Sequence, residues 1–176
     1  MKSDVISITN HGDGFEQALE ETRKVSAYKG LGGKDALHLM LFTEEMLSMA
    51  KIVAGDMAAN FWIETEGDDF VLHMTTKTKL DKQMRTQLIE TSTSRRNEAA
   101  NSFLGKLRDA FEQAMASDHT YEEAPYDVME DIIGREIADT EWDQFECSIL
   151  RKLADTVKVS IRGNEVDMTV RKSFAK

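Results

Sequence analysis

The sequence predicts an α+β fold, a two-layer sandwich in which helices cover one face of a mixed, mostly antiparallel sheet. Three features of the chain lead to this prediction. Residues 157–161 and 166–170 alternate between apolar and polar side chains, as half-buried strands do. Residues 61–65 and 70–76 repeat that pattern in the middle of the chain. Residues 36–54 form an almost wholly apolar run that is typical of a buried helix.

The N-terminal part is expected to form a strand and two helices. Residues 5–9 are rich in β-branched side chains, and turn-forming residues follow at 10–14. Apolar residues then recur at helical spacing over 15–25. The glycines within 30–33 separate this helix from the buried one, which is expected to end near Gly55.

The middle of the chain is expected to form a hairpin followed by a helix. Residues 61–65 and 70–76 flank the polar segment 66–69, which predicts a turn of four residues. Asp81 is a suitable N-cap for a helix that runs through Glu90.

The C-terminal part is expected to be helical until the closing hairpin. A polar break at 91–94 precedes an amphipathic stripe over 103–115. A short helix is expected at 128–133 and a longer one at 142–153. Residues 163–164, Gly-Asn, supply the turn between the last two strands.

Length and composition favour one cytoplasmic domain. The chain has 176 residues, of which 41% are hydrophobic, and this is enough for one well-buried core. Its longest apolar run is shorter than the roughly 18 residues of a membrane span, and its N-terminus has no signal-peptide pattern. Cys147 is the only cysteine, which excludes an internal disulfide and a cysteine-based zinc site. We therefore expect neither membrane association nor secretion.

The net charge of -10 is concentrated in one part of the chain. Residues 118–146 contain eleven acidic residues and a single base, Arg135, whereas residues 77–108 carry a modest basic excess. A protein with this charge would repel nucleic acid over much of its surface, so nucleic-acid binding is disfavoured. A solvated loop and helix face explains the acidic segment more simply than a dedicated docking site does.

Several polar residues are candidates for binding an anion. Ser94, Arg95 and Arg96 offer a hydroxyl and two guanidinium groups near an expected helix start, where a phosphate can bind. Helix capping with surface arginines is the simpler interpretation, and we prefer it. Lys77 and Lys79 alternate along an extended segment, and ordinary strand-edge lysines explain them equally well.

Two adjacent acids, Glu44 and Glu45, interrupt the apolar helix. At 100° per residue, at least one of their carboxylates must lie beside the apolar face. A charge in such a place either sits at an edge or is kept for a task. Ser48 follows one turn after Glu44.

The order of these elements resembles the GHKL, or histidine-kinase-like, ATPase fold, and most closely its compact form in bacterial anti-sigma factor serine kinases. The likeness covers residues 3–80 and 142–174, from VISIT and FEQALEETRKVSAYKG through KDALHLMLFTEEMLSMAKIV to SILRKLADTVKVSIRGNEVDMTVRKSF. Residues 81–141 replace the family's nucleotide lid with an enlarged helical and acidic insert. The resemblance implies one domain over residues 1–176.

The resemblance also assigns roles to individual positions. Glu44 stands where the family has its catalytic base, and Ser48 stands where an Asn holds the magnesium that is bound to ATP. Serine lacks the reach of the amide oxygen, although a hydroxyl can coordinate magnesium. The family reads adenine through an Asp-x-Gly-x-Gly motif, but this chain has Thr76, Lys77 and Lys79 in that region, with no acid or glycine.

The leading functional hypothesis is a regulatory protein that has lost ATP chemistry and binds a protein partner, as anti-sigma factors bind sigma factors, through its helical layer or through residues 81–141. We expect no cofactor in that case. Two alternatives remain. The chain would be an ATP-dependent serine kinase or ATPase if Glu44 acts as base and Ser48 with water holds Mg²⁺. It would be a structural module if its first helix pairs with a second copy.

Overall fold

The computed structural model describes residues 1–55, 57–100 and 146–174. The elements in these ranges are, in chain order, β1 (Ile6–Ile8), α1 (Phe15–Tyr28), α2 (Gly33–Ala54), β2 (Ala59–Glu66), β3 (Asp69–Lys77), α3 (Lys82–Thr91), the 3₁₀ helix η1 (Glu98–Ala100), α6 (Glu146–Leu153), β4 (Thr156–Arg162) and β5 (Glu165–Ser173). Each helix and strand that the sequence predicted within the described ranges is present. The expected helices at 103–115 and 128–133 lie outside the described residues, as does most of the insert.

The five strands form one sheet in the order β1-β2-β3-β5-β4. Every pairing among these strands is antiparallel, so the sheet is not mixed as the sequence analysis expected. The two hairpins, β2–β3 and β4–β5, meet at the pairing of β3 with β5. The prediction of an α+β two-layer fold is confirmed, although the sheet is wholly antiparallel among the described strands.

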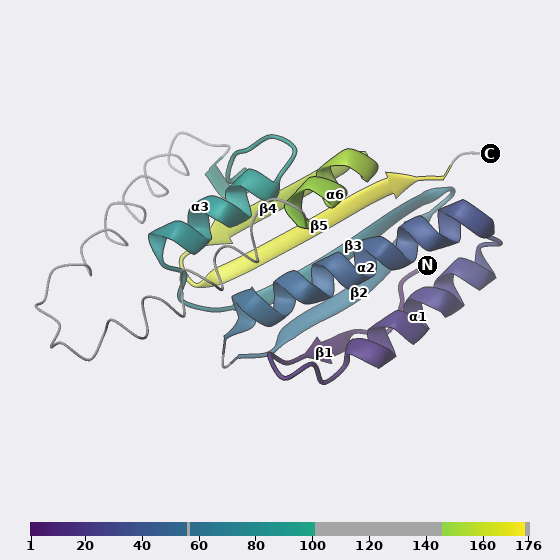
Figure 1. Cartoon of the computed structure of the whole chain (residues 1–176), viewed down its shortest axis with the longest axis horizontal. Coiled ribbons are helices and arrows are strands. Elements are labelled where there is room, and N and C mark those ends of the chain that lie inside the picture. Colours follow the sequence, from purple (N-terminus) through teal and green to yellow (C-terminus); the bar gives the residue numbers. More distant parts are fainter. Residues whose placement is uncertain (56, 101–145, 175–176) are drawn as a thin grey trace, which may run out of the picture.

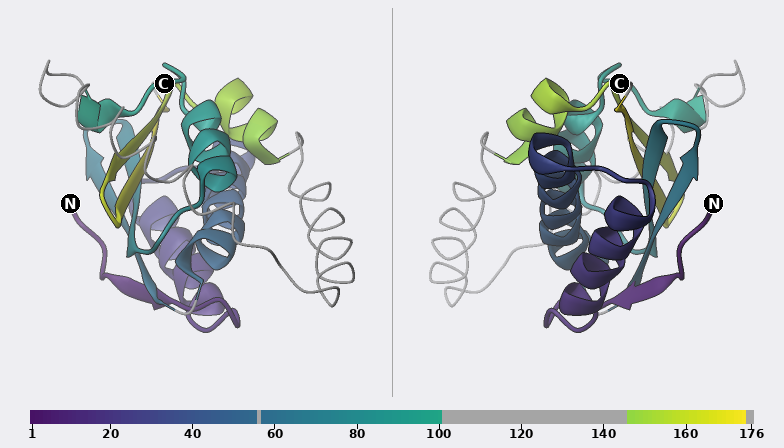
Figure 2. Two further views of the ribbon diagram at one scale, coloured as in Figure 1. Left: turned by 90° about the vertical axis from the view of Figure 1, so that its left-hand side faces the viewer. Right: turned by 90° about the vertical axis from the view of Figure 1, so that its right-hand side faces the viewer.

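The helices pack on one face of this sheet and form the second layer (Figure 1). α1 and α2 contact the half made of β1, β2 and β3, whereas α3 and α6 contact β4. The two views of Figure 2 look along the layers and show α1, α2, α3 and α6 gathered on one side of the strands, with the 3₁₀ helix η1 at the β4 edge, away from them. The opposite face of the sheet carries no described α-helix.

The core lies between the layers and follows the alternation of the strands. The closing hairpin confirms the prediction most completely, because each of its predicted apolar positions is at most 1% exposed. These positions are Val157, Val159, Ile161, Val166, Met168 and Val170. Their neighbours on each strand point to the uncovered face, which explains why one face of the hairpin is apolar and the other polar.

The turn between β2 and β3 is shorter than predicted. Glu66 pairs with Asp69, so the loop has two residues instead of four. Gly67 occupies the first loop position with φ of 58°, a conformation that glycine adopts without strain. The polar residues at the ends of both strands hid this boundary, because they resemble turn residues in the sequence.

α2 is buried on one side only, which corrects the expectation of a fully enclosed helix. Leu39, Phe42 and Met46 are inaccessible to solvent, whereas Leu37 is 67% exposed on the outer side. α1 packs beside α2, and the buried hydroxyl groups of Thr22 and Thr43 hydrogen bond across the two helices at 3.0 Å. The apolar run therefore provides both a core surface and an exposed apolar surface.

Two helix starts have clear local causes. The side chain of Asp81 accepts a hydrogen bond from the backbone N–H of Met84 at 2.7 Å, so Asp81 caps α3 as predicted. α1 begins after Gly14, whose φ is 84°. A Cβ atom at Gly14 would lie 2.1 Å from the carbonyl oxygen of Ser7, so only glycine fits between β1 and α1.

No helix among the described residues is both long and apolar enough to cross a membrane.

Candidate functional site

Glu44 and Ser48 lie on the outer side of α2. Glu44 is exposed and Ser48 is half-buried. At 100° per residue, Glu44 lies about 160° around the helix from the buried Met46, so it points away from the sheet. The buried acidic atom belongs to Glu45, one of whose carboxylate oxygens is inaccessible to solvent. The prediction that a carboxylate lies beside the apolar face is therefore confirmed for Glu45.

The candidates at the end of β3 have partners within the fold. Thr76 is 5% exposed, and its hydroxyl donates a hydrogen bond to the carbonyl oxygen of Ala58 at 3.2 Å. The ammonium group of Lys77 lies 3.4 Å from a carboxylate oxygen of Glu165, its neighbour on β5. Lys79 is exposed beyond the strand.

Ser94, Arg95 and Arg96 are exposed in the segment that follows α3. The Ser94 hydroxyl donates a hydrogen bond to the Glu98 carboxylate at 2.9 Å, and Arg95 adopts a positive φ of 52°. This segment does not begin an α-helix over the described residues. Thr93 and Asn97 instead bond β4, and the helix that this segment was expected to cap lies outside the described residues.

The segment bonds the outer edge of β4 at Val157 and Ile161, through two side chains and through the backbone N–H of Thr93, which donates to the Val157 carbonyl oxygen at 2.8 Å. The backbone N–H of Val157 donates to the hydroxyl of Thr93 at 2.7 Å. The side-chain amide of Asn97 bonds both backbone groups of Ile161, at 2.8 Å to the N–H and 2.9 Å to the carbonyl oxygen. We name Thr93 and Asn97 the β4 cover. Its existence depends on a contact between residues 64 apart, which no local pattern reveals.

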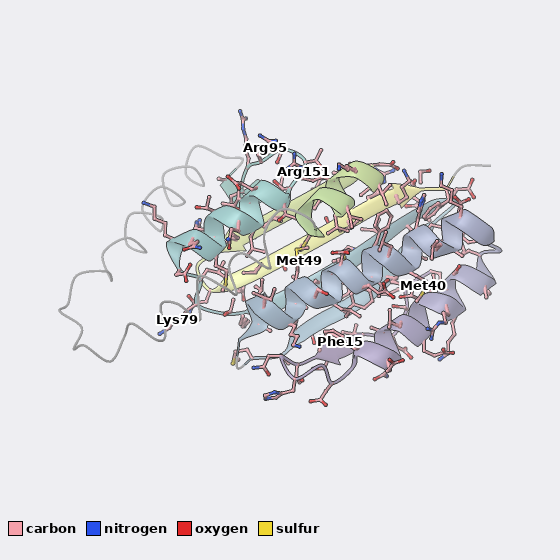
Figure 3. All side chains as sticks on the ribbon, in the orientation of Figure 1. Phe15, Met40, Met49, Lys79, Arg95 and Arg151 are labelled. Carbon is pink, nitrogen blue, oxygen red and sulfur yellow. The ribbon has the colours of Figure 1, made fainter. Side chains whose placement is uncertain are left out.

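The predicted site residues do not converge on one place. Glu44 and Ser48 share the outer side of α2, whereas Thr76 and Lys77 lie at the end of β3. Figure 3 shows Lys79 beside the start of α3 and Arg95 beyond the other end of that helix. The structure therefore keeps these candidates in three separate groups.

A polar cluster lies on the uncovered face of the sheet. The rings of Trp62 and His73 stack with centroids 4.8 Å apart and planes inclined by 3°. The ammonium group of Lys2 lies over the Trp62 ring, 4.6 Å from its centroid. Glu64 lies on the same strand face as Trp62, two residues further along β2. We name these four residues the Trp62 cluster.

Glu64 is the acceptor at the centre of the Trp62 cluster. One carboxylate oxygen accepts a hydrogen bond from the Trp62 indole N–H at 3.0 Å and lies 3.3 Å from the Lys2 ammonium. The other oxygen lies 3.5 Å from Nε2 of His73. The Trp62 hydrogen bond, together with Lys2 and His73, lowers the pKa of Glu64. Glu64 is therefore ionised at neutral pH.

His73 experiences opposing influences. Burial lowers its pKa most, the Glu64 carboxylate raises it, and the Lys2 ammonium lowers it further. The net effect is a pKa below 6.5, so the imidazole is neutral at pH 7. The Nε2 atom of His73 is buried without a hydrogen-bond partner.

Two cavities open on the same face. One of about 750 Å³ lies beside the Trp62 cluster and is lined by Lys2, Glu64, Asp69 and Arg171, among others. Another of about 360 Å³ contains Asp167, whose pKa is raised by desolvation and by the neighbouring Glu165.

The sequence contained a signal for the Trp62 cluster that the analysis did not use. Pairing 65 with 70 across the predicted hairpin places Trp62 opposite His73, as in the structure. Alternation then places both residues on the face away from the core. Only the approach of Lys2, which bridges to Glu64 from the start of the chain, could not be deduced locally.

No protein-family model, curated protein or solved structure matches the chain. Within residues 1–55, 57–100 and 146–174, no three His, Cys, Asp or Glu side chains form a group suited to a metal ion.

Proposed function

We propose that this chain is a regulatory protein of the histidine-kinase-like ATPase type that has lost ATP chemistry and acts by binding a protein partner. The main support for the proposal comes from Thr76 and Lys77, which lie where the resemblance implies that the adenine of ATP would bind. The Thr76 hydroxyl and the Lys77 ammonium are both engaged within the fold, with Ala58 and Glu165 respectively. A nucleotide would have to displace those contacts.

The position expected to hold magnesium favours the same proposal. Ser48 offers one hydroxyl oxygen on a surface where Glu44 is the adjacent acid, whereas magnesium demands near-ideal octahedral coordination by oxygen. Ser94, Arg95 and Arg96 lie along β4, which β5 separates from β3. These side chains therefore do not supplement Ser48 as a phosphate site.

The helical layer supports partner binding through its exposed apolar residues. Tyr28 at the end of α1 is 76% exposed, and Leu37 in the first turns of α2 is 67% exposed. Large apolar and aromatic side chains of this kind provide much of the binding energy in protein interfaces. The α1–α2 end of the layer is thus the surface we assign to the partner.

Calorimetric titration with ATP and with ADP, each in the presence of Mg²⁺, tests the loss of nucleotide chemistry. We expect no binding up to millimolar nucleotide. The serine kinase or ATPase hypothesis predicts a different result. The protein would bind nucleotide at micromolar concentration and turn it over, and Glu44→Ala would abolish the turnover but leave the binding intact. That result would overturn the proposal.

Cross-linking in cells tests the binding surface. A photoreactive amino acid at position 37 should yield a defined protein adduct that the Tyr28→Ser change weakens. The same amino acid at position 5 is the matched control, because Val5 is also apolar and 53% exposed but lies beside β1. Equal adducts from both positions would contradict the assignment of the surface. An adduct with a second copy of this chain would support the self-associating alternative.

A further inference from the structure

We propose that the Trp62 cluster is a proton-sensitive clasp that holds the N-terminal segment, residues 1–3, against β2 and releases it in mild acid. The proposal does not depend on whether the chain binds nucleotide.

The N-terminal segment is attached to β2 in two ways. Backbone hydrogen bonds run from Ser3 N–H to the Ile63 carbonyl oxygen and from Thr65 N–H to the Met1 carbonyl oxygen, both at 2.8 Å. Two side chains add to this attachment: the Ser3 hydroxyl accepts a hydrogen bond from the Ile63 N–H at 2.9 Å, and the Lys2 ammonium contacts both Glu64 and the Trp62 ring. Of these attachments, the Lys2 contacts are the ones that share their partners, Glu64 and Trp62, with His73.

His73 and Lys2 compete for the same two partners. The imidazole stacks on the Trp62 ring and approaches one oxygen of Glu64, while the ammonium lies over the same ring and approaches the other oxygen. A neutral imidazole leaves the negative charge of Glu64 to Lys2. A protonated imidazole gives the cluster a second positive charge, and the two cations then repel each other.

The coupling between the two residues must be reciprocal. The Lys2 ammonium disfavours the protonated form of His73 and so lowers its pKa. By thermodynamic linkage, a proton on His73 must disfavour the attached position of Lys2 by the same free energy. The direction of the effect therefore follows without any assumption about the path of release.

The other charges that face His73 leave this competition in place. On β5, its pairing partner is the neutral Thr169, and that residue is flanked by Asp167 and Arg171. Arg171 forms an ion pair with Asp69 at 2.6 Å, and Asp167 lies beside Glu165 in the smaller cavity. Lys158 of β4 lies one strand further away. Glu64 and Lys2 are thus the charged groups that shift the His73 pKa.

Release of the segment would change the uncovered face. Met1 and Lys2 line the cavity of about 750 Å³, so their departure would widen it and free the Glu64 carboxylate for a protonated His73. The acid form would then present a Trp62 face that Lys2 occupies at neutral pH. The clasp therefore links the protonation of His73 to the accessibility of an aromatic side chain.

Nuclear magnetic resonance of the full chain tests the coupling. The His73 ring should titrate below pH 6.5, the ordinary value for a histidine, with His73→Gln identifying its signal. Lys2→Met should move the His73 titration to higher pH, and Glu64→Gln should move it to lower pH. Lys158→Met is the matched control, since it removes a lysine from the same face of the sheet without touching the cluster. An unchanged His73 titration in Lys2→Met would overturn the proposal.

Amide hydrogen exchange tests the release itself. The amides of Ser3 and Thr65 should lose protection as pH falls through the His73 titration, after correction for the intrinsic pH dependence of exchange. The amide of Ile161, which bonds Asn97 on the far edge, should keep its protection. His73→Gln should make the protection of Ser3 and Thr65 independent of pH in this range. Protection that falls equally in His73→Gln would overturn the clasp.

Discussion

The two faces of the sheet differ completely although they are built from neighbouring residues. Phe61, Met74, Met168 and Val159 pair across four strands toward the helices, and each is at most 1% exposed. The next row, Trp62, His73, Thr169 and Lys158, pairs across the same strands on the uncovered face. A shift of one residue along each strand thus separates the row that stabilises the fold from a row free to carry charge.

The sharpest test of this difference compares two consecutive residues of β3. Leu72→Ala should reduce the free energy of unfolding by about 2–5 kcal/mol, because it leaves a cavity in a core position that is 0% exposed. His73→Ala removes a larger ring from the uncovered face and should cost clearly less. Denaturant unfolding of both variants checks this order. Equal losses would mean that the uncovered face also supports the fold.

A substitution at the edge of β4, where the two faces meet, should cause the next largest loss of stability. Asn97→Ala leaves the N–H and carbonyl oxygen of Ile161 without their side-chain partners, which should cost about 1–3 kcal/mol in denaturant unfolding. Ser94→Ala is the control, because the Ser94 hydroxyl is exposed and bonds only within its own segment. A similar loss from both changes would show that the cover acts through the conformation of its loop instead.

The uncovered face should make stability depend on pH through His73. Its pKa in the folded protein lies below the unfolded value of 6.5, so the unfolded chain binds this proton more readily. The His73 contribution is therefore present above pH 6.5 and is lost as pH falls through the folded pKa. Unfolding midpoints at pH 7.5 and pH 5.5 should differ less in His73→Gln than in the parent protein. An identical difference in both would assign the acid sensitivity to other groups.

Asp167 should make stability depend on pH in the opposite direction from His73, and by a smaller amount. Its raised pKa means that ionisation is less favourable in the folded protein than in the unfolded chain, so its contribution to stability is lost as pH rises through the folded pKa. Asp167→Asn should therefore stabilise the protein slightly at pH 7 and have no such effect below pH 3.8. Thermal unfolding at the two pH values measures this. Destabilisation at pH 7 would show that the carboxylate is needed by its neighbours.

The sequence predicted the described elements because each depends on local chemistry. Alternation defined the closing hairpin, and the N-cap Asp81 and the glycines near position 32 placed helix boundaries within a few residues. The strand order was not predicted in detail, since pairing of β3 with β5 joins residues about 100 positions apart. The shortened loop at Gly67 was missed because acidic residues continue the strands on their solvent side.

The candidate site was harder to predict than the fold. A resemblance in element order pointed to Glu44 and Ser48, but it contained no information on how loops bring distant side chains together. Lys2 reaches Glu64 from 62 residues away, and Asn97 reaches Ile161 from 64 away. Such contacts follow from the packed structure, whereas periodicity reports only which face a residue occupies.

The β4 cover has a consequence for the behaviour of the protein at high concentration. An outermost strand normally offers a row of backbone groups on which a strand of another molecule can align, and stacking of this kind leads to fibrils. Thr93 and Asn97 occupy the groups of Val157 and Ile161, and only the Val157 carbonyl oxygen is bonded by a backbone group, the Thr93 N–H. Side chains cannot propagate hydrogen bonding as a backbone does, so two polar residues outside any regular element make this edge a poorer template for aggregation.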